Sequence, residues 1–168
     1  MLCSLAIDSP VGRLTLSATP ETIVSISWAD APQGEPHALL IEAERQLEAY
    51  FAGRLTAFDL PLAPAGSAFD RRVWQAMRQI PYGQTRSYGE LAMEVGSAPR
   101  AIGGACGRNP IPIVIPCHRV VARNGRGGYS GGSGPATKDT LLALERATRM
   151  NHIPDAPILW QPTTVSSG

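Results

Sequence analysis

Several features that would define a class of protein are missing from this sequence. It contains no run of about 18 apolar residues, which argues against a membrane span. Its first residues, M-L-C-S-L-A-I-D-S-P, lack the charged segment and the apolar core of a signal peptide. The three cysteines lie far apart, at positions 3, 106 and 117, so they form no disulfide framework and favour a reducing compartment. We therefore expect a cytoplasmic protein with no membrane partner.

Metal-binding patterns are also missing. The chain has no C-x-x-C pair, and its three histidines are scattered at positions 37, 118 and 152. Structural zinc sites need closely spaced cysteine and histidine ligands. The sequence therefore predicts no metal site and no cofactor.

Lysine is nearly absent, and the charge that is present is distributed unevenly. Lys138 is the single lysine, so arginine carries almost all of the positive charge. Residues 1–70 contain three Arg and nine Asp or Glu, a balance of −6, whereas residues 71–126 contain nine Arg and two Glu, a balance of +7. Such a block indicates a polyanionic partner. The alternative is a solvated surface whose oppositely charged halves attract each other.

The first part of the chain has the pattern of a small α/β unit. Apolar residues alternate over residues 5–28 between Pro/Gly turns, which predicts short antiparallel strands. Apolar residues then recur at helical spacing over residues 37–54, with Gly53 as the stop. The stretch L-P-L-A-P-A-G-S-A at residues 60–68 is the best linker candidate. We predict a structural N-terminal domain over residues 1–64, a second domain over 65–155 and a tail over 156–168.

The second domain is predicted to be mainly helical. Ser67 or Asp70 can cap a first helix, and Ser87, with Glu90 three residues later, forms a capping box for a second. Pro99 opens a third, and two short helices joined by a Gly-containing turn outline a helix-turn-helix. The expected fold class is α+β, with a small N-terminal antiparallel sheet plus helix followed by this helical domain.

The third helix of this domain, R-A-I-G-G-A-C-G-R, is unusually thin because its middle consists of small residues. An exposed helix with small side chains can approach a broad, flat partner closely. Tight packing between helices is the alternative. The arginines at both ends favour the first interpretation.

The run N-P-I-P-I-V-I-P-C-H-R-V-V at residues 109–121 is the strongest candidate for a reactive site. It predicts a stiff, buried strand in which Pro116 fixes the bend that presents Cys117. A cysteine is a nucleophile only as a thiolate, so it needs a base or a positive environment. Neighbours in a strand point to opposite faces, so contact with His118 requires a turn or a bridging water.

A carboxylate should orient the imidazole of His118. Glu145 lies among leucines on the final predicted helix, where an unpaired charge would be costly, and it is the natural partner. For Arg119 we expect a structural salt bridge or hydrogen bonds to the turn. The competing interpretation is a buried cysteine with a purely structural role.

Four motifs carry a resemblance to a known family. They are I-P-C-H-R-V, preceded by R-N-P and followed by Y-S-G-G, together with V-W-Q-A-M-R-Q-I-P-Y-G-Q-T-R-S-Y-G-E-L-A, P-R-A-I-G-G-A and L-L-A-L-E. In this order they resemble the active-site signature, the entry into the helix-turn-helix, its recognition helix and the final catalytic helix of the O6-alkylguanine-DNA alkyltransferases (methylated-DNA–protein-cysteine methyltransferases). The resemblance covers roughly residues 69–146.

The resemblance implies a single-turnover DNA repair protein that flips O6-alkylguanine out of duplex DNA. Cys117 would accept the alkyl group irreversibly, His118 would take the thiol proton through a water, and Glu145 would hold His118. Tyr88 would protonate the departing guanine at N3, and Asn109 would hydrogen-bond around the turn that carries the cysteine. Implied DNA and base contacts are Arg100, which would replace the flipped nucleotide in the stack, and Ala101, Gly103, Val120, Tyr129 and Ser130.

The implied partner is double-stranded DNA containing O6-alkylguanine, bound by a monomer, with O4-alkylthymine and cooperative binding left open. Three other functions compete with this one. A damage-sensing protein on the same fold would have replaced Cys117. A helix-turn-helix regulator would need more side chains for reading bases than the thin helix offers. A thiol hydrolase using Cys, His and Glu would leave the basic block unexplained.

Overall fold

The computed structural model describes residues 2–152, and it has the predicted α+β fold class. The predicted tail at residues 156–168 lies outside this range. Within it, no helix combines the length and the hydropathy that a membrane crossing requires.

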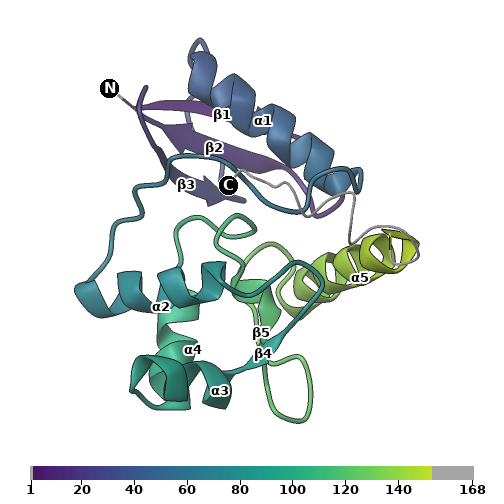
Figure 1. Ribbon diagram of the computed structural model, residues 1–168. Helices are drawn as coiled ribbons and strands as arrows, with labels where there is room; N and C mark the ends of the chain where they lie inside the picture. Colours follow the sequence, from purple (N-terminus) through teal and green to yellow (C-terminus); the bar gives the residue numbers. More distant parts are fainter. Residues whose placement is uncertain (1, 153–168) are drawn as a thin grey trace.

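The N-terminal part is a three-stranded antiparallel sheet covered by one helix (Figure 1). Strands β1 (Cys3–Ile7), β2 (Leu14–Ala18) and β3 (Ile23–Ser27) follow one another in the sheet, with β2 central and buried throughout. Helix α1 (Ala38–Phe51) packs on β1 and β2. Its apolar stripe forms the core of this layer, with Leu40, Ala43, Leu47 and Tyr50 all buried.

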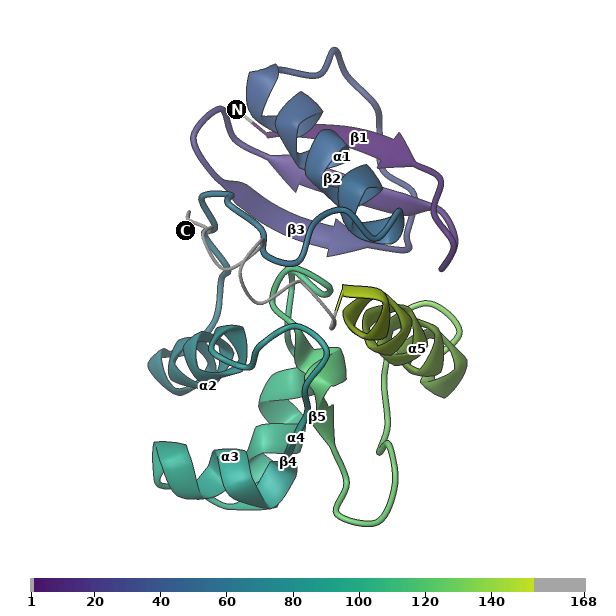
Figure 2. The same cartoon turned by 45° about the vertical axis from the view of Figure 1, so that its right-hand side comes forward.

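The C-terminal part is mainly helical, as predicted. Helices α2 (Ala68–Arg78), α3 (Tyr88–Val95) and α4 (Pro99–Gly107) pack on one another, and α5 (Pro135–His152) lies beside the N-terminal layer (Figures 1 and 2). Two short parallel strands, β4 and β5, join the start of α3 to the segment after the cysteine; they comprise Arg86–Ser87 and Val120–Val121.

Local capping chemistry fixes the helix-turn-helix. The Ser67 hydroxyl accepts from the Asp70 backbone and caps α2. Ser87 and Glu90 form the predicted capping box of α3. Gly96 ends α3 with φ +73, a left-handed conformation that glycine adopts without steric cost. Because α4 starts three residues later, the two helices are held at a fixed angle by a short turn.

The predicted strand before the cysteine is wrong. Residues 111–115 form a tight turn, in which Ile113 has φ +76 and the Ile115 N–H donates to the Ile111 carbonyl at 2.9 Å. Asn109 closes this turn, because its side-chain nitrogen donates to the Ile115 carbonyl at 2.8 Å and its oxygen accepts from the Ile111 N–H at 2.9 Å. The prolines of the segment remove the donors that a strand ladder needs. The turn is nevertheless buried, as predicted.

Strand β3 is the edge of the sheet nearest to the C-terminal helices in both views (Figures 1 and 2). Its Ile26 N–H donates to the Pro110 carbonyl at 2.9 Å. On the same strand, Ile23 exchanges backbone hydrogen bonds with the linker, accepting from Ala63 and donating to Pro61. The sheet is therefore bonded directly to the segment that leads to the cysteine.

Candidate active site

Cys117, His118 and Arg119 form one turn of 3₁₀ helix, which begins after Pro116. A 3₁₀ helix has three residues per turn, so consecutive side chains point in three different directions. All three side chains are buried. Pro116 thus precedes a bend at Cys117, and the bend is a helical turn.

The carboxylate of Glu145, on α5, is the centre of a buried hydrogen-bond network. Its Oε2 accepts from the Tyr50 hydroxyl and lies 2.7 Å from His118 Nε2. Arg119 forms the expected structural salt bridge, with Nε 2.9 Å from Oε1 and Nη2 3.0 Å from Oε2. The Gly83 N–H adds a fifth donor at 3.2 Å. Burial alone would raise the pKa of Glu145, but the bonds from His118 and Arg119 lower it, so the group is a carboxylate.

His118 is fully buried, and burial lowers the pKa of its imidazole despite the neighbouring carboxylate. The ring is therefore neutral at pH 7, with one N–H and one lone pair. Because Nε2 faces a carboxylate, it carries the proton and donates to Glu145. Nδ1 keeps the lone pair, and among residues 2–152 it has no hydrogen-bond partner. The Nδ1 atom of His118 is thus able to accept a proton.

Burial raises the pKa of the Cys117 thiol, while three neighbours oppose this effect. The Asn109 side chain, the ammonium of Lys138 and the Tyr129 hydroxyl each favour the thiolate. The thiol is therefore protonated at rest, and a base must remove its proton before it can attack an electrophile.

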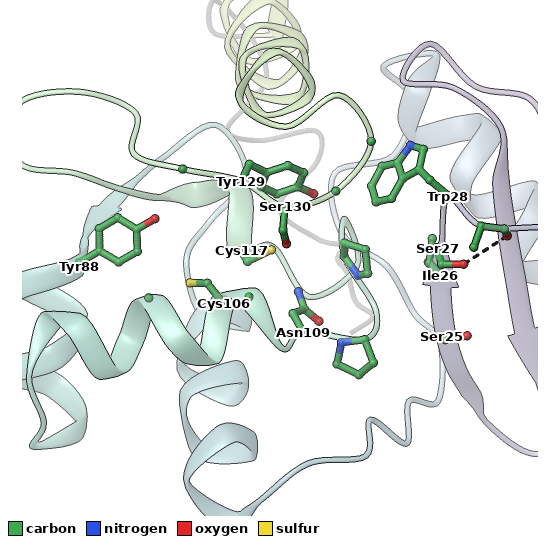
Figure 3. Close-up of a pocket in the computed structure, with 18 residues that line it drawn as sticks. Ser25, Ile26, Ser27, Trp28, Tyr88, Cys106, Asn109, Cys117, Tyr129 and Ser130 are labelled. Carbon is green, nitrogen blue, oxygen red and sulfur yellow. Dashed lines mark hydrogen bonds between the residues drawn. The ribbon is translucent and has the colours of Figure 1, made fainter.

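Cys117 opens into a cavity of about 890 Å³ (Figure 3). A volume of this size can bury a drug-sized molecule. Asn109, Tyr129 and Ser130 lie around the sulfur, with Tyr88 on one side of the view and Trp28 on the other. The remaining lining comes from the thin helix α4, from the turn before the cysteine at Pro110 and Pro112, from the glycine-rich loop at residues 128–132, and from β3 with the residues that follow it.

Tyr88, the first residue of α3, presents its ring to this cavity. Burial, and then the nearby Cys106 and Cys117, raise the pKa of its hydroxyl to about 12. The hydroxyl therefore keeps its proton at neutral pH and is available as a donor.

The structure gathers most of the predicted site residues and separates the rest. Those that line the cavity are Cys117, Asn109, Tyr88, Gly103, Tyr129 and Ser130. His118 and Glu145 lie behind the cysteine, in the buried network. Val120 lies outside the cavity lining, and its carbonyl accepts from Lys138 at 2.6 Å. Arg100 and Ala101 lie at the start of α4, away from the cavity lining.

The start of α4 is an exposed surface. Arg100 is exposed, and no other residue in 2–152 forms a hydrogen bond or an ion pair with its side chain. A Cβ added at Gly103 would meet nothing within 4 Å, so that part of the helix is open. Of the alternatives that the sequence left open, close approach by a partner fits this geometry better than helix packing.

In the part of the chain that the structure describes, a single ion pair joins the oppositely charged halves. The one pair between them is Arg108 with Asp70, which joins α4 to α2 within the helical part. Between residues 2–69 and 71–152 the structure describes no ion pair. The positive charge of the helical part is thus not neutralised by the N-terminal sheet.

Sequence reasoning missed Lys138. This residue is fully buried on α5, where Nζ donates to the carbonyls of Val120 at 2.6 Å and Gly128 at 3.1 Å. Nζ also lies 5.7 Å from the centre of the Tyr88 ring. One signal was available, because Lys138 precedes Glu145 by seven residues, or about two helical turns, and therefore shares its face.

No candidate metal centre accompanies this site. Among residues 2–152, no three His, Cys, Asp or Glu side chains gather in a way that could hold a metal ion.

The site therefore combines a buried thiol, an adjacent histidine bound to a buried carboxylate, and a helix-turn-helix with an exposed second helix start. Two family descriptions match the chain, the 6-O-methylguanine DNA methyltransferase DNA binding domain over residues 68–147 and the ribonuclease-like domain of the same proteins over residues 1–64. The methylated-DNA–protein-cysteine methyltransferase of Mycolicibacterium paratuberculosis is 47% identical over 150 residues, which is 83% of this chain and 90% of that protein.

Solved structures of methyltransferases are similar to this chain in sequence and in fold. The crystal structure of Mycobacterium tuberculosis O6-methylguanine methyltransferase has 42% identity and a TM-score of 0.79, covering 88% of this chain and 94% of that one. Mycobacterium tuberculosis OGT in complex with DNA has 44% identity and a TM-score of 0.78, over 85% and 92% of the two chains. The chain therefore belongs to the methylated-DNA–protein-cysteine methyltransferase family. This confirms the predicted family and its class of activity, repair of DNA by alkyl transfer to a cysteine.

Proposed function

We propose that this chain removes the alkyl group from O6-alkylguanine in duplex DNA and transfers it to Cys117. One observation supports the assignment to Cys117: the residue lines a cavity and is followed directly by His118. The Nε2 of His118 is bound to Glu145, and its Nδ1 has no partner among the described residues. A buried base in this state suits the removal of one proton from the adjacent thiol, through a water, because the thiol otherwise stays protonated.

The proposed transfer is a displacement at the alkyl carbon. The Cys117 sulfur forms a thioether with that carbon, and the bond from the carbon to guanine O6 breaks. The thiol proton goes to His118, while the leaving guanine takes a proton at N3 from Tyr88. Transfer of the proton from His118 back to Tyr88 restores both residues. The thioether remains, so each protein molecule reacts once.

The target base must leave the duplex to reach a buried sulfur, and flipping costs a few kcal/mol. We assign Arg100 to the vacated position in the base stack, because its guanidinium is exposed, planar and unpaired within residues 2–152. Ala101 and Gly103 let α4 approach the minor groove, which is only about 6 Å wide. Tyr129 and Ser130 line the pocket for the flipped base. The Val120 backbone remains a predicted contact of that base.

DNA is the partner that the matched DNA-binding domain and the DNA complex of the Mycobacterium tuberculosis protein support. The alkylguanine specificity, the monomeric state and the cytoplasmic location stay predictions from the sequence.

The test is incubation with duplex DNA that carries one O6-methylguanine, followed by mass spectrometry of the digested protein. We expect the peptide containing Cys117 to gain one methyl group in place of a hydrogen, with one modification per protein molecule. Cys117→Ala should bind the DNA without reacting, and Cys106→Ala, a change in the same cavity, should still react. Continued turnover, or modification at Cys106 instead, would contradict the proposal.

A further inference from the structure

The N-terminal sheet forms one wall of the active-site cavity, although the sequence suggested only a structural role for it. The cavity lining includes the stretch from Ser25 to Ala29, which is the end of β3 and the residues after it. In Figure 3, Trp28 lies on the opposite side of the cavity from Tyr88. Its side chain is the largest that the sheet contributes to this wall.

Trp28 lies directly against the loop that carries Tyr129 and Ser130. A Cβ added at Gly131 would lie 2.4 Å from Cζ3 of the indole, and one at Gly132 would lie 2.9 Å from Nε1. Only glycine allows so close an approach of backbone and ring. The indole is itself held, because its Nε1–H donates to the Val11 carbonyl at 2.8 Å.

Two side chains of α5 also anchor the loop, and within it the Gly134 N–H donates to the Gly131 carbonyl at 2.8 Å. Lys138 binds the Gly128 carbonyl at 3.1 Å, and the Thr137 hydroxyl accepts from the Ser133 N–H at 2.8 Å. The glycines between these points lower the cost of alternative backbone conformations. The stretch just after Ser130 lies between these bonds and against the indole, so Trp28 connects it to the N-terminal sheet.

We propose that Trp28 is a positioning residue for alkyl transfer, through which the N-terminal sheet holds the Tyr129–Ser130 wall over Cys117. The inference rests on the proposed function of Cys117. Trp28 acts through the loop, so its loss changes the placement of the base relative to the sulfur. The expected loss of rate is roughly tenfold or more, because a misplacement of about 1 Å can cost about 100-fold.

The first experiment compares single-turnover rate constants for Trp28→Ala and Leu5→Ala with wild type at saturating O6-methylguanine DNA. Leu5 packs against the core from β1 but does not line the cavity, so its variant reports general weakening of the sheet. We expect Trp28→Ala to react roughly tenfold more slowly at unchanged DNA affinity, with faster hydrogen exchange at residues 128–134. Leu5→Ala should retain the wild-type rate and the wild-type exchange of the loop.

A double-mutant cycle tests the contact itself. Gly131 has no positive φ, so Gly131→Ala is acceptable to the backbone but forces its Cβ against the Trp28 ring. Each single variant should therefore slow transfer. In the double variant Trp28→Ala/Gly131→Ala the clash with the indole is gone, and the rate should exceed the product of the two single effects by at least about threefold, a coupling of about 0.7 kcal/mol.

The outcomes separate this inference from the proposed function. If wild type transfers no methyl group to Cys117, the proposed function fails. If wild type reacts and Trp28→Ala reacts at the same rate, or no more slowly than Leu5→Ala, the inference is overturned while the function stands. Strictly multiplicative effects in the cycle would also overturn it, because the contact with Gly131 would then play no part in transfer.

Discussion

Replacement of Lys138 by Met removes a buried charge and keeps most of the side-chain volume. The ammonium of Lys138 favours the Cys117 thiolate and donates to two carbonyls, at 2.6 and 3.1 Å. A hydrogen bond from a charged donor contributes about 1.5–3 kcal/mol. Relief from burying an ammonium offsets part of this loss. We expect Lys138→Met to lower the free energy of unfolding by about 1–3 kcal/mol.

The larger effect should be on reactivity. Without the ammonium the thiol pKa rises further, and each added pKa unit lowers the thiolate fraction about tenfold at fixed pH. We expect the rate constant at pH 7 to fall roughly tenfold or more, because the thiolate becomes rarer. A higher thiol pKa lowers the thiolate fraction mainly at pH values below that pKa. The difference in rate constant between Lys138→Met and wild type should therefore shrink as the pH increases.

The assay is single-turnover transfer from a free O6-alkylguanine base, measured from neutral to alkaline pH. A free base removes DNA binding and base flipping from the measurement. Asp139→Asn is the matched control, since it changes a charge on the exposed neighbour of Lys138. A constant deficit at every pH would refute the electrostatic reasoning and leave Lys138 as an anchor for Val120 and Gly128 only.

Three further predictions concern the network and the DNA surface. Glu145→Gln should lower the free energy of unfolding by about 3–5 kcal/mol in chemical denaturation, because it leaves the buried Arg119 without its carboxylate; an unchanged midpoint would contradict this. Arg100→Ala should slow repair of duplex DNA far more than reaction with the free base, whereas equal losses would place Arg100 in the pocket or the fold. Burial lowers the pKa of His118, so the unfolded chain protonates there first and stability should fall as pH drops below about 6.5. His118→Gln should show a smaller loss over that interval in thermal unfolding, and an equal loss would refute this assignment.

Local signals made the helical part predictable. The capping box of Ser87 and Glu90, the stop at Gly96 and the start at Pro99 each act within a few residues, so the helix-turn-helix follows from neighbouring side chains. Glu145 was also predictable, because a lone carboxylate on an apolar helix face requires a partner.

Contacts between distant segments could not be predicted in this way. The apolar run before Cys117 has the composition of a strand, but the side chain of Asn109 closes it into a turn. The sequence pattern places Trp28 at the end of an alternating strand. Nothing near it in the sequence indicates that it contacts the loop at Gly131. Such contacts depend on where β3 and α5 lie in three dimensions, which propensity and periodicity do not encode.

The 3₁₀ turn explains why a thiol, an imidazole and a guanidinium can be adjacent in sequence yet serve one site. In a strand, His118 would point away from both neighbours, and no single carboxylate could reach it together with Arg119. Three residues per turn instead separate the side chains, so Cys117 lines the cavity while His118 and Arg119 both bind Glu145. Arg119 thereby keeps Glu145 ionised, and the ionised carboxylate keeps the proton of His118 on Nε2. The lone pair on Nδ1, which the proposed transfer requires, therefore depends on an arginine that never has to contact the substrate.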